Sequence, residues 1–339
     1  MKRKLLLFML LFLFTFLLVA CGEETADDVL QSLNEKADEM NSYQATATMT
    51  METGEEPQQF NVDIWHKKED YYKVSLQNQM DENSNQIILR NDEGVFVLTP
   101  SINKSYKFQN DWPKQHSQPY LFHSLVDDIT SDTERQFRTT ENYYVFEVRT
   151  NYRGNQQLPF QEIYFHRGTY KPALVRVKNQ EGDSMVEVDF TSFEFDVDID
   201  DQEFETEHNL AEGTLSVPTM GESEDRDIMI YLPANLPEGT SAVSEQLVSF
   251  DEGERVISTY DGEKQFTLIQ EMYYSFPTAL DVPVFTNGDM VDLGFTIGAL
   301  TNHTLEWQMD GMNFILASDS LTVDEMVMVA QSVQQSVMK

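Results

Sequence analysis

Cys21 is the only cysteine in the chain, and thiols are good nucleophiles. It stands directly after Leu18, Val19 and Ala20, where an almost purely apolar run that begins at Leu5 ends. A thiol of this kind can be alkylated, and an alkylated Cys21 would leave no thiol for a disulfide within the chain. An incidental cysteine of a secreted protein is the alternative, and it fits this position less well.

Histidines are further candidates for ligands or bases, but their spacing indicates neither role. None falls in a two-histidine helix motif, and no second cysteine is present to complete a zinc site. The sequence also contains no glycine-rich phosphate loop and no G-x-S-x-G elbow. It therefore predicts no enzyme, no metal site and no cofactor. The six histidines are His66, His116, His123, His166, His208 and His303.

Four acidic residues have the spacing of a calcium-binding loop: Asp196, Asp198, Asp200 and Glu207 stand at its positions 1, 3, 5 and 12. The sixth position requires glycine for a sharp turn, and here it is Asp201. Apolar residues alternate with these acids from 195 to 199, which is typical of a strand with one solvated face. We therefore expect a strand that continues through residue 199, with a calcium loop as the alternative.

The N-terminal segment, residues 1–20, has the three zones of an export signal: a basic start, a short apolar core and small residues before the cleavage site. Its core is shorter than the roughly 20 residues of a membrane span. The run Leu18-Val19-Ala20-Cys21 resembles the lipobox of bacterial lipoproteins. This resemblance implies that the Cys21 thiol is alkylated with diacylglycerol and that the chain is cleaved before Cys21, which can then be N-acylated. It also implies fatty acids such as palmitate in the anchor, and a lipid-anchored protein on the extracytoplasmic face of the cell membrane. An uncleaved anchoring helix is the alternative.

The chain is strongly acidic, with a net charge of −35. Removal of residues 1–20 takes away three basic residues and no acids, so 20 basic against 58 acidic residues would give −38. Nucleic-acid binding requires a basic surface, and the acidity excludes it. It also disfavours binding of anionic lipid headgroups through the protein surface. Because 40% of the residues are hydrophobic, the charge indicates the solvated surface of a folded protein.

Hydrophobic periodicity divides the rest of the chain into two units. The first, residues 21–208, should open with a helix after the capping box of Thr25 and Asp28, continue as antiparallel strands, and contain a helix near 119–129. Its last strand changes phase at Thr191-Ser192, which indicates a bulge. Several strands are apolar on both faces, so the sheet needs cover on both faces or encloses something apolar.

A polar segment over 209–227 is the expected linker to a second unit, residues 228–339. Asp310-Gly311 is a hairpin signal in this unit, and Thr322 with Glu325 forms a capping box that predicts a closing helix. Its predicted strands lie near 228–232, 242–250, 255–260, 265–273, 290–297, 304–308 and 312–318. The predicted fold class is α+β with mostly antiparallel strands.

The element order of the first unit resembles the LolA-like superfamily of lipoprotein carriers. The stretches "IWHKKEDYYKVSL" and "ILRNDEGVFVLTP" resemble the YdcC family of sporulation lipoproteins in bacilli, and more distantly the germination lipoprotein GerS. The second unit, through "YLPANLPEG" and "LTVDEMVMVAQS", resembles a small domain of unknown function that often follows such modules. The resemblance implies an incomplete β-barrel with covering helices, between which the carriers bind acyl chains.

The candidates for lining such a cavity are Met49, Met51, Tyr72, Phe96, Leu121, Phe122 and Phe146. A fully packed core beneath the same helices is the alternative. The leading hypothesis is a non-enzymatic, membrane-anchored lipoprotein that binds a hydrophobic, lipid or lipoprotein ligand in sporulation or envelope assembly. Two alternatives stay open: a module that holds or activates a cell-wall enzyme, as the resemblance to GerS suggests, and a two-domain envelope sensor.

Overall fold

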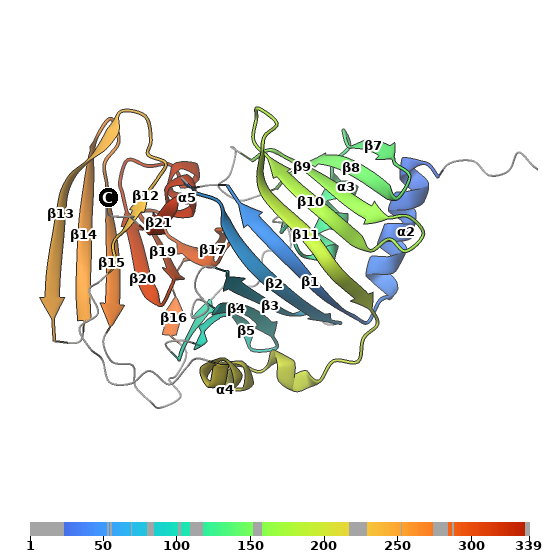
Figure 1. Cartoon of the computed structure of the whole chain (residues 1–339), viewed down its shortest axis with the longest axis horizontal. Helices are drawn as coiled ribbons and strands as arrows, with labels where there is room; N and C mark the ends of the chain where they lie inside the picture. Colours follow the sequence, from blue (N-terminus) through green and yellow to red (C-terminus); the bar gives the residue numbers. More distant parts are fainter. Residues whose placement is uncertain are drawn as a thin grey trace, which may run out of the picture.

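The computed structural model describes residues 24–52, 54, 56–68, 70–79, 85–100, 103–108, 118–151, 158–216, 229–251, 253–273, 284–286 and 288–335. Cys21 and the lipobox predicted before it lie outside these ranges. Two large sheets stand side by side in the molecule (Figure 1). Among the described helices, none combines the length and the apolar character that crossing a membrane requires.

The larger sheet is open and has twelve strands in the order β16-β6-β5-β4-β3-β2-β1-β11-β10-β9-β8-β7. Its pairs are antiparallel, apart from the parallel pair of β16 with β6. The strands of the first unit are β1 (Ser42–Met51), β2 (Gln58–Lys67), β3 (Tyr71–Asn78), β4 (Asn85–Asn91), β5 (Gly94–Thr99), β6 (Lys104–Phe108), β7 (Gln136–Thr139), β8 (Tyr143–Arg149), β9 (Phe160–His166), β10 (Pro172–Lys178) and β11 (Ser184–Phe195).

The second sheet has seven antiparallel strands in the order β13-β14-β15-β20-β19-β18-β17, and β12 pairs separately with β21. Asp310 and Gly311 both have positive φ, 52° and 73°, in the turn between β19 and β20, as the hairpin signal predicts. The elements of this unit are β12 (Tyr231–Pro233), β13 (Thr240–Phe250), β14 (Gly253–Gly262), β15 (Phe266–Tyr273), β16 (Val284–Thr286), β17 (Asp289–Asp292), β18 (Ile297–Leu300), β19 (Thr304–Met309), β20 (Met312–Ala317), α5 (Val323–Gln331) and β21 (Val333–Gln335).

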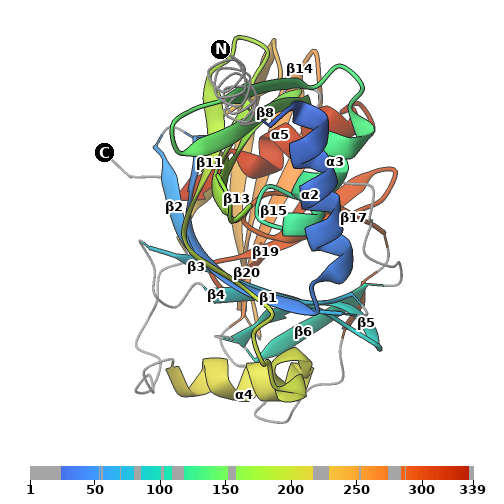
Figure 2. The ribbon, with the colours of Figure 1, turned by 90° about the vertical axis from the view of Figure 1, so that its right-hand side faces the viewer.

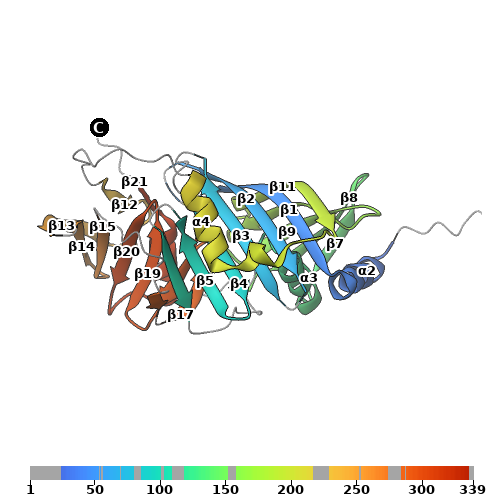
Figure 3. The ribbon, with the colours of Figure 1, turned by 90° about the horizontal axis from the view of Figure 1, so that it is seen from below.

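Helices cover both faces of the larger sheet. On one face lie α2 (Ala26–Glu39) and α3 (Phe122–Ser131), and on the other lie the short helix η3 (Asp201–Phe204) and α4 (Thr206–Ser216) (Figures 2 and 3). Both predicted capping boxes are present, at the start of α2 and at the start of α5. The prediction of an α+β fold with an incomplete, helix-covered barrel is confirmed.

The second helical layer explains why β4 and β5 are apolar on both faces. Ile88 and Val97 belong to the main core, whereas Ile87 and Phe96 pack with Phe204 of η3 in a separate core cluster on the other face. Each face therefore has its own cover. Helix α4 also extends into the predicted linker, residues 209–227, because it runs from Thr206 to Ser216. The first part of the predicted linker is therefore helical.

The predicted bulge is present. Thr46 pairs with Ser192 and Ala47 with Phe190, so Thr191 is the extra residue between them. Both halves of β11 consequently turn their apolar side chains toward the same core: Val186, Val188, Phe190 and Phe193 are buried in it, and Phe195 packs against it.

The predicted continuation of this strand to Ile199 is wrong. The strand ends at Phe195, because Asp196 adopts a left-handed backbone conformation with φ of 55°. Its carboxylate accepts a hydrogen bond from the backbone N–H of Asn41 at 2.9 Å, and Asp200 caps η3 through the N–H of Gln202. Within the described residues, no group of three or more His, Cys, Asp or Glu side chains is placed to hold a metal ion.

Candidate functional site

A row of aromatic and imidazole rings crosses the larger sheet beneath α3. Tyr43 of β1 is paired with His66 of β2, and His66 with Tyr72 of β3. His66 stacks on Tyr72 with ring centroids 4.6 Å apart, and His123 of α3 meets His66 edge-on at 4.7 Å. Phe122 of α3 packs against Tyr43 at 6.4 Å. We call these five residues the His66 cluster.

Burial favours the neutral form of both imidazoles in the His66 cluster. It lowers the pKa of His66 to about 3, with a further contribution from His123, and it also lowers the pKa of His123. His66 donates Nδ1–H to the carbonyl of Tyr71 at 3.0 Å, and His123 donates Nε2–H to the carbonyl of Ala37 at 3.2 Å. Nδ1 of His123 is buried without a hydrogen-bond partner among the described residues. The sequence motifs missed this pair because its members lie on different elements.

The seven residues predicted to line a cavity are all buried, but they do not form one group. Six of them, Met49, Met51, Tyr72, Leu121, Phe122 and Phe146, belong to the main core between the sheet and its helices. Phe96 belongs to the cluster on the opposite face, so it is not a neighbour of the other six. Strand alternation cannot tell the two faces of a sheet apart, so the sequence pattern alone does not separate Phe96 from the other six.

Aromatic packing fills much of the space between α3 and the sheet. Phe122 contacts Phe165, Phe193 and Phe195, with centroid distances of 6.2, 5.8 and 5.3 Å. Phe193 in turn stacks on Tyr43 at 5.0 Å. Binding of an acyl chain at this place would therefore require these rings to move.

The first unit and the second are joined by buried polar contacts as well as by a shared core. The side chain of Thr99 donates to Oε1 of Gln308 at 2.7 Å, and Gln86 donates to the Gln308 carbonyl at 2.6 Å. Gly294, with φ of 86°, lies so close to Met51 that a Cβ there would come within 2.6 Å of the Met51 methyl carbon. The two units thus form one continuous core.

The outermost strand of the second sheet, β13, is the most exposed described strand. All nine residues from Ser241 to Ser249 are exposed, and β13 pairs on one side only, with β14. Val243, Leu247 and Val248 keep 58%, 59% and 42% of their surface accessible. Sheet edges carry unpaired N–H and C=O groups, and proteins normally blunt them with lysine, proline or short strands. β13 has eleven residues and contains neither lysine nor proline.

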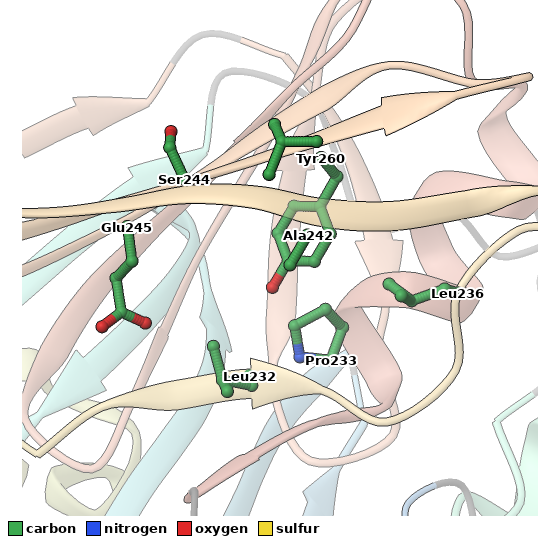
Figure 4. Close-up of a pocket in the computed structure, with 8 residues that line it drawn as sticks. Leu232, Pro233, Leu236, Ala242, Ser244, Glu245 and Tyr260 are labelled. Atoms are coloured by element: carbon green, nitrogen blue, oxygen red, sulfur yellow. The ribbon is translucent and has the colours of Figure 1, made fainter.

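A pocket of about 360 Å³ lies between β12 and the first half of β13 (Figure 4). Its floor is apolar, because Tyr260 is buried there and stacks on Phe266 at 4.3 Å. Burial, together with the nearby carboxylate of Glu245, raises the pKa of Tyr260 to about 12, so its hydroxyl stays protonated. The residues that line the pocket are Leu232, Pro233, Leu236, Ala242, Val243, Ser244, Glu245 and Tyr260.

The fold and these sites define a two-sheet α+β protein with an open, helix-covered sheet and an accessible edge strand. The family model for sporulation protein YdcC-like sequences matches residues 1–204. Sporulation protein YdcC of Bacillus subtilis (strain 168) is 45% identical over 318 residues, which cover 94% of this chain and 93% of that protein. The chain therefore belongs to the YdcC-like family of sporulation proteins.

Solved structures show more distant likenesses. A chain of the Pseudomonas aeruginosa MucA/MucB complex is 14% identical, with 92% of this chain and 100% of that chain covered and a TM-score of 0.36. A LolA superfamily protein from Nitrosomonas europaea is 13% identical, with 55% and 100% covered and a TM-score of 0.31. A chain of the complex of the Clostridioides difficile CwlD amidase with the GerS lipoprotein is 16% identical, with 51% of this chain and 97% of that chain covered and a TM-score of 0.24. At such scores these likenesses determine neither ligand nor partner.

Proposed function

We propose that the chain is a lipid-anchored protein of the cell envelope that acts in sporulation by binding a partner protein, without catalysing a reaction. Membership of the YdcC-like family supports the role in sporulation. The long, exposed edge strand β13, which contains neither lysine nor proline and lies beside an apolar pocket, is the observation that carries partner binding. A module that holds or activates a cell-wall enzyme is one form of this function.

The proposed anchor rests on the resemblance of Leu18-Val19-Ala20-Cys21 to a lipobox. The first described helix, α2, begins at Ala26, so a lipid on Cys21 would hold the folded part within a few residues of the bilayer. A diacylglyceryl group supplies the two acyl chains that stable anchoring needs. Mass spectrometry of the mature protein tests this directly. We expect a lipid-modified N-terminal cysteine, and for Cys21→Ser loss of both the modification and membrane attachment; an unmodified thiol would contradict the anchor.

Partner binding is tested with a photo-crosslinking amino acid placed in the full chain in sporulating cells. Val243 of β13 is the test position, and Val323 of α5, which is 40% exposed, is the matched control. We expect one crosslinked product of defined mass from position 243 that position 323 does not give. Equal products from both positions, or none, would argue against partner binding through β13.

A second candidate function is binding of an apolar ligand between the sheet and its helices. It is favoured by the six predicted lining residues that share the main core. The packed rings around Phe122 count against an open cavity, so a ligand would have to displace α3. Native mass spectrometry of the full chain should show a retained lipid if this function is correct, and a protein free of lipid that takes up no fluorescent fatty acid would exclude it.

A further inference from the structure

We propose that β13 is a docking strand for an extended, basic segment of a partner protein, which adds to the edge of the second sheet and places an apolar side chain in the pocket beside it. This inference rests on the proposed function and specifies the chemistry of its partner. It follows from the backbone of β13, its side chains, its charge and the adjoining pocket.

The backbone of β13 offers a long pairing edge. The strand runs for eleven residues and is paired with β14 from Thr240 to Phe250, with a bulge at Val243. On the regular stretch from Ser244 to Phe250, alternate N–H and C=O groups are directed away from the sheet. An added strand would satisfy these groups by main-chain hydrogen bonds, while its alternate side chains face the two sides of the sheet. The edge is visible at the far end of the molecule from α2 (Figure 1).

The side chains of β13 are more apolar than those of edge strands that face solvent. Val243, Leu247 and Val248 are exposed, and Glu245 is the only charged residue in the strand. Single exposed apolar residues are ordinary on protein surfaces, but three on one edge strand without lysine or proline are typical of an interaction surface.

Charge determines which occupant fits. From Glu238 to Lys264 the sequence contains seven acidic and two basic residues. Both basic residues are engaged in ion pairs, Arg255 with Glu271 and Lys264 with Glu325. A second copy of this chain would bring an equally acidic edge against the first, and like charges disfavour that contact. A segment that carries lysine or arginine would be attracted instead.

The pocket specifies the side chains further. Its apolar wall, formed by Leu236 and Pro233 with the ring of Tyr260, accepts an aliphatic or aromatic side chain. Glu245 lines the same pocket, and its carboxylate is drawn on the side of Leu232 and Pro233 (Figure 4). We therefore expect an apolar residue of the partner in the pocket and a basic residue near Glu245.

Fluorescence anisotropy with the Cys21→Ser chain and a labelled peptide of about nine residues, in which lysine and valine alternate, tests this inference. We expect saturable binding that weakens at least about tenfold when every peptide amide is N-methylated, because the methylated peptide keeps its charge but has no backbone donors. Glu245→Lys should weaken binding severalfold, and Glu93→Lys, in the exposed turn between β4 and β5, should not. Val243→Ser combined with Leu247→Ser should weaken binding, with Val323→Ser as control.

Several outcomes would overturn it. Equal affinity of the methylated and unmethylated peptides would mean that the peptide does not add as a strand, and equal effects of the two lysine variants would mean diffuse charge attraction. Concentration-dependent dimerisation that Leu247→Ser abolishes would make a second copy the occupant. If position 243 crosslinks to a partner but the peptide does not bind, this inference fails and the proposed function stands; if position 243 gives no crosslink, the proposed function itself fails.

Discussion

At the scale of single residues, the fold strongly alters the protonation of His66. Its imidazole is buried and stacked on Tyr72, and its pKa of about 3 lies far below the 6.5 of an unfolded chain. Below about pH 6.5 the unfolded chain therefore takes up a proton that the folded chain does not. The stability that neutral His66 permits is complete above this pH and is lost progressively as the pH falls toward 3.

His66→Phe should reduce this pH dependence, because phenylalanine keeps a ring beside Tyr72 and cannot be protonated. Between about pH 7 and pH 5, we expect the free energy of unfolding of the unaltered chain to fall by about 2 kcal/mol more than that of the variant. Urea unfolding at the two pH values measures the difference. His166→Phe, at an exposed position at the end of β9, is the control and should keep the original slope. Equal slopes for the unaltered chain and His66→Phe would contradict this account.

At the scale of elements, helix starts are set by local side chains. Thr322 accepts a hydrogen bond from the N–H of Glu325 at 3.3 Å, and Glu325 accepts one from the N–H of Thr322 at 2.8 Å. The backbone N–H and the hydroxyl of Thr322 and the ammonium of Lys264 hold the carboxylate of Glu325 at the start of α5. Burial raises the pKa of this carboxyl group, but the hydrogen bonds from Thr322 and Lys264 outweigh burial and lower the pKa.

Thr322→Ala should remove one arm of this cap and lower the free energy of unfolding by about 1 kcal/mol. Thr322→Ser keeps the hydroxyl and should stay close to the original stability. Chemical denaturation of both variants checks the prediction, and equal losses for alanine and serine would show that the hydroxyl does not act as a cap.

Because of the bulge at Thr191, the apolar side chains of both halves of β11 point into the same core. Deletion of Thr191 would shift the register by one residue, so that Phe193 and Phe195 turn outward or Val186 and Val188 do. We expect a chain that fails to fold cooperatively, measured by circular dichroism and by proteolysis. Thr191→Ala keeps the residue count and should fold, because Thr191 is exposed. A folded deletion variant would contradict the register.

Sequence patterns predicted the elements that local signals define. The two capping boxes, the hairpin at Asp310-Gly311 and the phase change at Thr191 were all visible in the order of residue types. The missed features depend on partners distant in sequence. The three residues of β16 form a strand only because β6 lies beside them, and His66 meets His123 only through the packing of α3. Alternation likewise does not reveal that β13 lies at an edge.

At the scale of the whole molecule, the two units share one hydrophobic core. Strand β16 of the second unit extends the sheet of the first, and the main cluster of buried residues runs through both. Trp65 lies in the first unit and Trp307 in the second, so fluorescence of single-tryptophan variants can follow each unit. We expect the two probes to report one coincident unfolding transition.

The buried hydrogen bond between Thr99 and Gln308 joins the two units, and we expect its loss to lower the free energy of unfolding. Gln308→Leu removes the acceptor of the Thr99 hydroxyl, and a buried hydroxyl without a partner costs about 1–3 kcal/mol. Thr99→Val combined with Gln308→Leu removes both polar groups, so its cost should be smaller than the sum of the single changes. Denaturant unfolding of the double-mutant cycle, followed by both tryptophan probes, measures this coupling. Additive costs would mean that the side chains of Thr99 and Gln308 do not stabilise each other. Separate transitions in the single-tryptophan variants that retain Trp65 or Trp307 would mean that the two units are stable independently.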